Sequence, residues 1–196
     1  EMSRGLGDVY KRQSQNILRY SNNYSMAYPS IIHTEHFCFK SYTLLSDSEH
    51  KTIWQIRNDP GIRMYMDNSE PFPFEGHQKF VTSLLQNSEK AYYGVYEILG
   101  GKLIGNQCIV NSNIEKTAES GQYIFPSEQG HGYGTLMKYE FIDYLFKQEL
   151  LQRVIEKVKK FNERNNHLNL KLGFRLYESD SEYNYYEVNP KTLNVQ

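Results

Sequence analysis

Gln129-Gly130-His131-Gly132-Tyr133-Gly134 is the stretch of sequence that decides the fold. It follows Pro126, which cannot donate to a strand ladder and therefore ends the strand-like segment before it. A largely apolar segment follows the loop, over residues 136–146, and predicts a helix buried against a sheet. Glycines let a backbone approach a ligand, and the free amides of a first helical turn attract anions. The layout predicts an anion-binding turn between a strand and a buried helix.

Taken alone, the Gly-x-Gly-x-Gly pattern is weak, because a flexible turn has the same composition. Two familiar nucleotide-binding motifs are disfavoured. The loop lacks the Gly-Lys-Ser/Thr of a P-loop. It also follows a series of antiparallel strands instead of opening a βαβ unit with an acidic residue about 20 positions on, which weakens a dinucleotide-binding interpretation.

The segments before the loop predict a strand, two helices and then three antiparallel strands. Aromatic and apolar residues over 36–45 favour the first strand, and Ser46-Asp47-Ser48-Glu49 supplies caps for a helix that ends near Asn58-Asp59-Pro60-Gly61. Helical spacing of apolar residues predicts the second helix. Gly100-Gly101 predicts a hairpin turn. The expected ranges are 75–86 for the second helix and 92–99, 103–110 and 118–125 for the three strands.

After the buried helix, the pattern predicts a strand, a helix and two more strands. A short β-branched run covers 154–158, and a helical pattern over 162–172 ends at Gly173. The last strands are expected over 174–177 and 183–188. We find no repeat or linker, so residues 31–196 form one domain in this interpretation. Residues 1–30 are expected to be an extension outside the fold, and the part through Gln13 resembles a fusion or read-through scar.

Composition restricts the class of protein. Hydrophobic residues make up 39% of the 196 residues and charged ones 23%, and no apolar run is long enough for a bilayer, so a soluble domain without a membrane partner is predicted. The net charge of −1 argues against a nucleic-acid partner. Cys38 and Cys108 lack metal-ligand spacing, so we expect buried free thiols and no metal site. Without a signal peptide or a disulfide framework, the cytoplasm is the expected compartment.

At this point the sequence resembles the GNAT acyltransferase superfamily. Gln129, Gly132 and Gly134 fill its Gln/Arg-x-x-Gly-x-Gly/Ala signature, and residues 119–126 resemble its fourth strand. Residues 162–174 resemble its Asn-x-x-Ser-x-x-Leu-Tyr-x-Lys-x-Gly-Phe segment. The resemblance implies an α/β (α+β) GNAT fold, with a mixed, mostly antiparallel sheet of about seven strands, splayed between strands 4 and 5, and about four helices on its two faces.

The resemblance also implies acetyl-coenzyme A as co-substrate and assigns its contacts. Backbone groups of Ile124 and Phe125 would pair with the pantetheine arm, and Asn162, Asn165 and Asn169 would border the coenzyme. The pyrophosphate would be held by the loop residues Gln129, Gly130, His131, Gly132, Tyr133, Gly134 and Thr135. Many family members have a tyrosine at the position of Asn169, where it protonates the departing thiolate. Here either another group, such as Tyr177 or a water molecule, supplies the proton, or the thiolate leaves without help.

Within the superfamily, one segment is similar to two groups of enzymes. Its elements are Trp54-x-x-Arg57-Asn58-Asp59-Pro60, then Tyr65-Met66, then His77-x-x-Phe80-Val81. The more similar group contains N-acetyltransferases of pseudaminic acid biosynthesis, which acetylate the 4-amino group of a UDP-linked 4-amino-4,6-dideoxy sugar. The other acetylates the N-termini of ribosomal proteins. The acceptor contacts implied are Trp54, Arg57, Asn58, Tyr65, Met66 and His77.

These observations predict an enzyme that transfers acetyl to a small-molecule amine in a ternary complex. Glu119, on the implied central strand, is the candidate base, acting through water, although a surface carboxylate is the alternative. Because Asn169 cannot supply a proton, a coenzyme-binding module without turnover stays open, as does an acetyltransferase of protein N-termini. His77 could titrate near neutral pH or pack as a structural histidine. Tyr183, Tyr185 and Tyr186 form either sheet surface or the edge of a homodimer.

Overall fold

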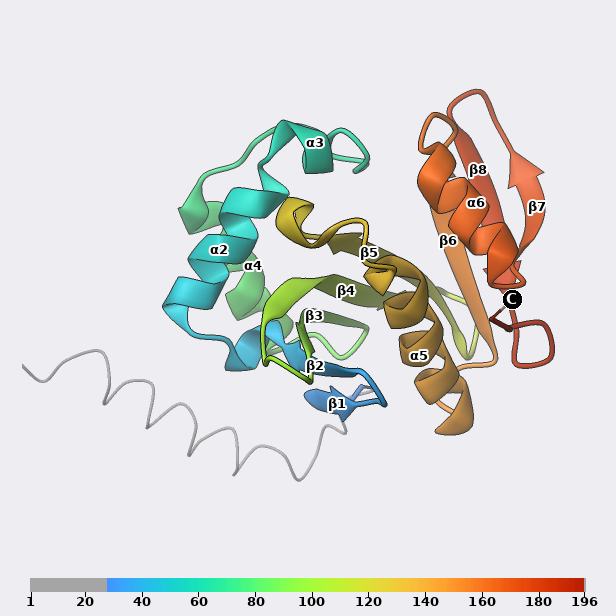
Figure 1. Ribbon diagram of the computed structural model, residues 1–196, viewed down its shortest axis with the longest axis horizontal. Helices are drawn as coiled ribbons and strands as arrows, with labels where there is room; N and C mark the ends of the chain where they lie inside the picture. Colours follow the sequence, from blue (N-terminus) through green and yellow to red (C-terminus); the bar gives the residue numbers. More distant parts are fainter. Residues whose placement is uncertain (1–27, 196) are drawn as a thin grey trace, which may run out of the picture.

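An eight-stranded mixed sheet organises residues 28–195, the part of the chain that the computed structural model describes (Figure 1). The strand order is β1-β2-β3-β4-β5-β6-β8-β7. Every neighbouring pair is antiparallel except β5 and β6, which run parallel. The strands are β1 (Ile31–His33), β2 (Phe37–Ser41), β3 (Lys90–Glu97), β4 (Leu103–Asn111), β5 (Thr117–Ile124), β6 (Arg153–Lys159), β7 (Arg175–Ser179) and β8 (Tyr183–Val188).

The sheet is open at its centre because β5 and β6 pair over only a short length. Thr117, Ala118 and Glu119 face Arg153, Val154 and Ile155, and the pairing ends there although both strands continue. The strands therefore diverge from Glu119 onward, as Figure 1 shows. The predicted splay is confirmed, and it lies between the fourth and fifth of the strands that the sequence predicted.

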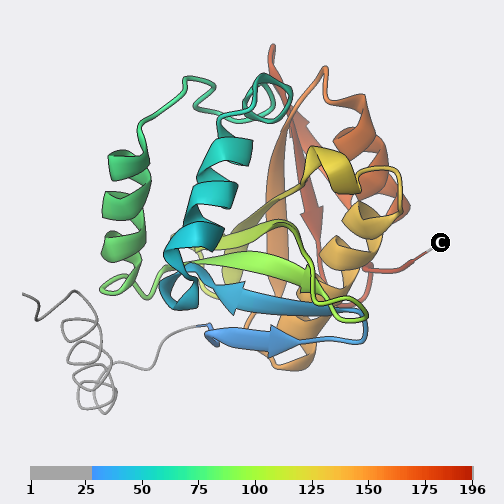
Figure 2. The ribbon, with the colours of Figure 1, turned by 60° about the vertical axis from the view of Figure 1, so that its left-hand side comes forward.

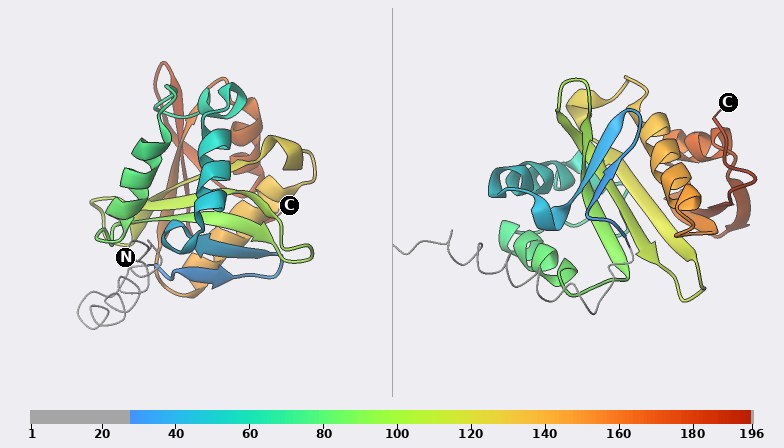
Figure 3. Two further views of the ribbon diagram at one scale, coloured as in Figure 1. Left: turned by 90° about the vertical axis from the view of Figure 1, so that its left-hand side faces the viewer. Right: turned by 90° about the horizontal axis from the view of Figure 1, so that it is seen from below.

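Helices cover both faces of the sheet. Figure 3 shows α2 and α4 on one side and α5 and α6 on the other, and Figure 2 shows how strongly the sheet twists between β2 and β8. The helices are α2 (Asp47–Arg57), α3 (Pro60–Arg63), α4 (Phe74–Leu84), α5 (Tyr133–Lys147) and α6 (Glu163–Lys171), and short 3₁₀ turns are η1 (Tyr42–Leu44) and η2 (Pro126–Glu128).

The larger part of the core lies between α5 and the sheet. Phe141 on α5 packs against Phe39 and Tyr93, with ring centroids 5.0 and 5.6 Å apart. Met137 and Leu145 on the same helix are also fully buried, which confirms that the segment after the glycine loop is a core helix. A second, smaller apolar cluster lies on the side of α2 and α4, where Phe125 joins it. The rigid layer under α5 fixes the position of the glycine loop at its N-terminus.

The structure adds elements to those predicted. Residues 28–195 contain eight strands instead of about seven, because β1 has only three residues and shows no readable alternation. The same residues contain five α-helices instead of about four. Asp59-Pro60, predicted only as a helix stop, also starts α3, where the Asp59 side chain accepts from the Gly61 amide. At α2, Ser46 and Glu49 form the capping box that the sequence indicated.

The fold begins earlier than the expected boundary at residue 31. Tyr28 is 3% exposed within the main core, and the Tyr93 hydroxyl donates to the Pro29 carbonyl oxygen at 2.8 Å. The predicted scar through Gln13 lies outside the described residues. Between residues 28 and 195, no helix combines the length and apolar character needed to cross a membrane.

Candidate active site

The glycine loop opens onto a pocket of about 380 Å³ that we call the glycine-loop pocket. It lies where β5 and β6 diverge, with α3 on one side and α6 on the other. Its lining residues are Gly61, Ile62, Tyr65, Met66, Gln122, Tyr123, Ile124, Gln129, Gly132, Gly134, Thr135, Asn162, Arg164, Asn165, His167, Leu168 and Lys171.

Two glycines of the loop have a backbone conformation that other residues rarely adopt. Gly130 and Gly132 have φ values of +86° and +79°, in the left-handed region that favours glycine. Gly132 caps α5, so the amides of the first helical turn have no partner within the helix. A Cβ atom at Gly134 would lie 3.7 Å from Gln122, Ile124 and Leu168, on the wall of the pocket. The arrangement suits a phosphate that approaches the backbone closely.

The opposite wall is α6, and its basic side chains were not predicted. Arg164, His167 and Lys171 line the pocket together with Asn165. Spacings of three and four residues place side chains on one face of a helix, so the positions 164, 167 and 171 contained this signal. Arg164 and Lys171 place two positive charges on this wall of the pocket, which favours an anionic ligand.

Five of the predicted coenzyme residues do not line the pocket: Phe125, Gly130, His131, Tyr133 and Asn169. Phe125 belongs to the apolar cluster beside α2, and the Tyr133 ring packs edge-on against Phe37. The His131 ring contacts the Glu128 carbonyl oxygen at 3.1 Å. Asn169 has no exposed surface, and its side-chain oxygen accepts from Lys138 at 2.7 Å.

A second pocket, of about 390 Å³, lies on the α2 and α4 side and is called the Glu119 pocket. It shares Tyr65, Met66, Gln122 and Tyr123 with the glycine-loop pocket, so the two pockets meet at β5. Its other lining residues are Tyr42, Ile53, Arg57, Asp67, Asn68, Phe72, His77, Phe80, Tyr92, Asn106, Cys108, Glu119, Ser120, Gly121 and Lys157. Of the predicted acceptor residues, Arg57, Tyr65, Met66 and His77 are among the residues of this pocket.

Glu119 carries the negative charge on the floor of this pocket. Desolvation by the pocket walls raises the pKa of its carboxyl group, the nearby Asp67 raises it further, and Lys157 opposes both. Lys157 itself pairs with Asp67 at 3.1 Å. Gly121, two residues along the same face of β5, adds no side chain between Glu119 and Tyr123. The carboxylate therefore faces open space next to the junction of the pockets.

Phenol groups and a guanidinium also line the Glu119 pocket. Among the described residues, the Tyr123 hydroxyl and Arg57 Nη1 are buried without a hydrogen-bond partner. Arg57 Nη2 donates to the Asn68 carbonyl oxygen at 3.1 Å. Burial raises the pKa of Tyr92 and of Tyr123 above the ordinary value, so both hydroxyls remain protonated donors. These groups thus present donors for a polar or anionic acceptor.

Trp54 and Asn58 are placed differently from the prediction. The Trp54 indole and the Asn58 amide both donate to the Phe72 carbonyl oxygen, at 2.8 and 2.9 Å, and Phe72 N donates to Asn58 Oδ1 at 3.0 Å. Neither residue lines the Glu119 pocket. Both side chains instead hold the loop before α4 in place, and the sequence alone could not distinguish this role from contact with a ligand.

His77 is not a neutral-pH base in this environment. Its Nε2 lies 3.0 Å from His50 Nδ1. Burial, and then the charge of His50, lower the pKa of His77 to about 4. The imidazole is therefore uncharged near neutral pH and acts as a polar wall of the pocket.

Tyr177 lies on β7, at the edge of the sheet, and lines neither pocket. Its ring contacts the Arg153 guanidinium, 5.4 Å from the ring centroid. Tyr186 on the adjacent strand is 2% exposed and donates to Asn166, whereas Tyr183 and Tyr185 are partly exposed. Tyr177 therefore lies outside the pocket that contains Glu119, although the pKa of Tyr177 is raised by burial and, to a smaller extent, by the charge of Glu119.

The cysteines are partly exposed instead of buried. Cys108 lines the Glu119 pocket, where desolvation, with smaller contributions from Glu119 and Glu156, raises the pKa of its thiol to about 12. Since the thiolate is the nucleophilic form, this thiol is a poor acceptor of an acyl group.

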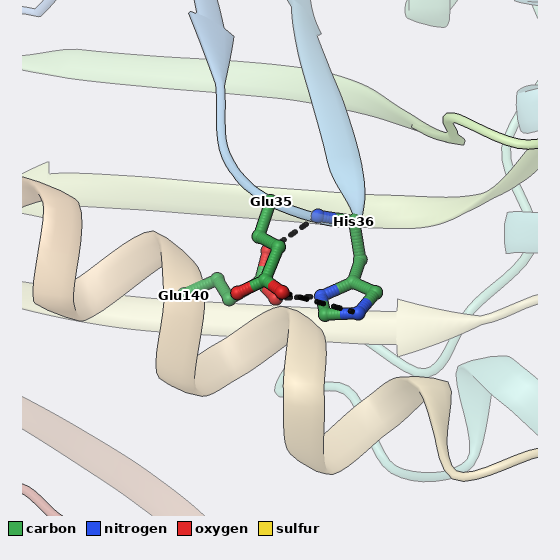
Figure 4. Close-up of side chains that lie close together, drawn as sticks. All are labelled: Glu35, His36 and Glu140. Atoms are coloured by element: carbon green, nitrogen blue, oxygen red, sulfur yellow. Dashed lines mark hydrogen bonds and ion pairs between the residues drawn. The ribbon is translucent and has the colours of Figure 1, made fainter.

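Within residues 28–195, one cluster of side chains has ligand atoms close enough together to hold a metal ion. It consists of Glu35, His36 and Glu140 (Figure 4). Both Glu140 oxygens are already used: Oε1 pairs with His36 Nδ1 at 2.5 Å, and Oε2 accepts from the Thr34 hydroxyl and the His36 amide. The group therefore ties the turn between β1 and β2 to α5.

Comparison with known proteins agrees with this geometry. Residues 43–175 match the model of the acetyltransferase (GNAT) domain family, and the chain belongs to that family. It is 31% identical over 150 residues to acetyltransferase PseH of Campylobacter jejuni, covering 74% of this chain and 89% of that protein. The crystal structure of Campylobacter jejuni N-acetyltransferase PseH in complex with acetyl coenzyme A matches with a TM-score of 0.64 at 26% identity, over 79% of this chain and 99% of the other.

The fold is shared more widely. Spermidine N-acetyltransferase from Vibrio cholerae, in complex with coenzyme A and spermine, matches with a TM-score of 0.71 at 18% identity, over 81% of this chain and 98% of the other. This similarity shows the fold alone. The family and the relatives establish that the protein is an acyltransferase that uses acetyl-coenzyme A.

Proposed function

We propose that the enzyme transfers acetyl from acetyl-coenzyme A to the 4-amino group of a UDP-linked 4-amino-4,6-dideoxy sugar. The observation that carries the proposal is the meeting of the two pockets at Gln122 and Tyr123, with Glu119 on the acceptor side. A coenzyme in one pocket and an amine in the other would come together at this junction.

Acetyl-coenzyme A fits the glycine-loop pocket. The left-handed Gly132, the free first-turn amides of α5 and the basic side chains of α6 suit its phosphates. The diverging strands leave the edge of β5 beyond Glu119 unpaired by β6, where a pantetheine amide can pair with backbone groups near Ile124.

The Glu119 pocket supports a nucleotide-linked acceptor. Tyr42, Tyr92 and Tyr123 offer flat aromatic surface and hydroxyls, and Arg57 Nη1 offers a buried donor without a partner among the described residues. Tyrosine combines apolar area with one polar tip, and arginine suits phosphate oxygens. The resemblance of residues 54–81 to the sugar acetyltransferases points to the same acceptor.

The acceptor amine must be neutral when it attacks the thioester of acetyl-coenzyme A. Positioning beside the thioester contributes about 7–11 kcal/mol to such reactions. Deprotonating a lysine-like amine near neutral pH costs about 4.6 kcal/mol, whereas an amine with a pKa near 8 costs about 1.4 kcal/mol. As the C–N bond forms, Glu119 takes the amine proton through water. The C–S bond then breaks with its electron pair on sulfur, and the sulfur takes a proton.

Tyr65 and Tyr123 line both pockets and therefore replace Tyr177 as the phenols nearest to the departing sulfur. Tyr123 is the more buried of the two, and its hydroxyl has no partner within the described residues. We assign it as the donor to that sulfur.

Product analysis tests the proposal. The enzyme is incubated with acetyl-coenzyme A and the UDP-linked 4-amino sugar, with the corresponding 4-hydroxy sugar as matched control, and with peptides bearing free N-termini. Mass spectrometry should show acetylation of the amino sugar alone. Acetylated peptide beside unchanged sugar would favour an N-terminal acetyltransferase, and binding of acetyl-coenzyme A without any product would favour a module without turnover.

A further inference from the structure

Lys138 is a buried cation directly behind the glycine-loop pocket. It lies on α5, one turn beyond the first helical residues, and has no exposed surface. Its Nζ donates to Glu156 Oε2 at 2.6 Å, to Asn169 Oδ1 at 2.7 Å and to Asn165 Oδ1 at 2.9 Å. These partners come from β6 and α6, so one ammonium group joins three elements around the pocket.

The ammonium fixes the orientation of both asparagine side chains. A lysine has three N–H donors and no acceptor, so only the oxygen of a carboxamide can face it. Asn165 and Asn169 must therefore both turn Oδ1 toward Lys138 and Nδ2 away from it. The three contacts use all three donors of the ammonium, and no donor remains to bind a ligand directly.

The two Nδ2 groups reach different surroundings. Asn169 Nδ2 and the second oxygen of Glu156 are buried with no partner in the part of the chain described. Asn165 instead lines the glycine-loop pocket, and its Nδ2 is not among the buried side-chain atoms that lack a partner. A buried ion pair whose neighbouring polar atoms lack hydrogen-bond partners contributes little to folding stability, because the desolvation of its charges offsets their attraction. A role in orienting Asn165 accounts for the arrangement better.

We propose that Lys138 is a positioning residue for the coenzyme: it holds the Asn165 carboxamide with its N–H groups facing the pocket, where they donate to an oxygen of acetyl-coenzyme A. This inference rests on the proposed location of the coenzyme in the glycine-loop pocket. It assigns a role to a residue that touches neither substrate.

The first test replaces the Nδ2 donor of Asn165 and leaves Lys138 unchanged. Asn165→Asp keeps an oxygen toward the ammonium but places a second, charged oxygen where Nδ2 faced the pocket. We expect the affinity for acetyl-coenzyme A, measured by calorimetry, to fall at least about tenfold, while the melting temperature is retained. Affinity equal to that of the unmodified enzyme would overturn the proposal.

The second test removes the ammonium. Lys138→Met alone would leave Glu156 as a buried unpaired charge, so the informative variant is Lys138→Met with Glu156→Gln, which removes both charges. It should raise KM for acetyl-coenzyme A about tenfold, with a smaller change in kcat. Because Lys138 acts through Asn165, the double variant should have no further effect on KM when Asn165 is already alanine.

Two experimental outcomes distinguish a failure of the Lys138 proposal from a failure of the proposed coenzyme site. If Lys138→Met/Glu156→Gln weakens binding equally with and without Asn165, the network acts through general structure, and the positioning role is wrong. If Arg164→Ala and Gly132→Ala also leave acetyl-coenzyme A binding unchanged, the coenzyme is bound elsewhere and the proposed site is wrong. Should the charge-free variant fail to fold, Asn165→Asp decides the inference alone.

Discussion

At Glu119, desolvation produces a property that suits the role of general base that we propose for it. The raised pKa of the carboxyl group makes its ionised form a stronger base than an exposed glutamate. The same shift affects stability: a carboxyl group with a raised folded-state pKa favours folding at low pH, and this contribution is lost as pH rises through that pKa. Near neutral pH, the ionised Glu119 therefore opposes folding.

Glu119→Gln should accordingly lose activity and gain stability. We expect kcat/KM near neutral pH to fall about 100-fold, with partial recovery at high pH as the acceptor amine loses its proton unaided. The melting temperature at neutral pH should rise. Glu178→Gln, a change at an exposed site on β7, is the matched control and should alter neither quantity. An unchanged pH–rate profile in Glu119→Gln would remove Glu119 from the mechanism.

Tyr123→Phe tests the donor to the departing sulfur. Removal of the hydroxyl should lower kcat about tenfold or more while KM for acetyl-coenzyme A changes little, because the interaction develops as the C–S bond breaks. Tyr65→Phe is the comparison, since this tyrosine lines both pockets but is 40% exposed. A larger loss of kcat in Tyr65→Phe would transfer the role to Tyr65.

At the scale of elements, the loop before α5 shows which part of the proposed coenzyme site could be predicted from the sequence. Glycine spacing, a terminating proline and a following apolar helix are all local signals, and they predicted a loop followed by a core helix, although α5 begins at Tyr133, earlier than the expected start at residue 136. The Glu119 pocket is different, because Tyr42, Tyr92 and Lys157 come from separate elements that only the sheet order brings together. No sequence spacing relates them, so that wall could not be predicted.

Local sequence also could not distinguish side chains that contact a ligand from side chains that hold a loop in place. Trp54 and Asn58 carry side chains that would suit an acceptor, but both hydrogen-bond the loop at Phe72. Asn169 lies at a position implied to border the coenzyme, yet the buried ammonium of Lys138 holds it in the interior. The sequence of α5 presents Lys138 as an interruption in an apolar face, and its three partners follow only from the packing of α5 on β6 and α6.

Gly132→Ala tests whether the conformation of the loop serves binding. Alanine in the left-handed region costs about 1–2 kcal/mol. Gly101, in the turn between β3 and β4, also has a left-handed φ, +66°, and an added Cβ at either glycine would contact nothing within 4 Å. Both Gly132→Ala and Gly101→Ala should therefore lower stability similarly in thermal unfolding. Only Gly132→Ala should raise KM for acetyl-coenzyme A. If the two variants had the same KM, the loop would not be a phosphate site.

The link between the β1–β2 turn and α5 should make stability depend on pH. His36 faces Glu35 and Glu140, and its hydrogen bond with Glu140 is the largest cause of its raised pKa. A histidine with a raised folded-state pKa contributes stability fully below its unfolded pKa, and the contribution disappears as pH rises through the folded value. Glu140→Gln should therefore destabilise the protein more at about pH 6 than at about pH 8.5.

Thermal unfolding at the two pH values measures this difference. Asp143→Asn is the control, because Asp143 lies on the same helix and pairs with Lys147 at 2.7 Å instead of with a histidine. Its effect on stability should be the same at both pH values. Equal destabilisation by Glu140→Gln at both pH values would show that the contact with His36 does not depend on the histidine charge.

At the scale of the whole molecule, the open sheet provides two adjoining pockets, so both substrates can bind before acetyl is transferred. The glycine-loop pocket is bordered by α5 and α6, the Glu119 pocket lies on the α2 and α4 side, and they meet at β5. Both substrates can therefore be present together, and direct transfer needs no acyl-enzyme. Cys108 is the thiol placed in the Glu119 pocket, and its raised pKa, to about 12, keeps it protonated.

A ternary complex predicts intersecting lines when initial rates are measured against one substrate at several fixed concentrations of the other. Incubation with acetyl-coenzyme A alone should leave the mass of the protein unchanged. Cys108→Ala should still transfer acetyl, although the space opened in the pocket can shift the acceptor KM. Parallel lines, together with an acetylated protein that Cys108→Ala no longer forms, would instead establish a covalent intermediate at this cysteine, since the first product would then leave before the amine binds.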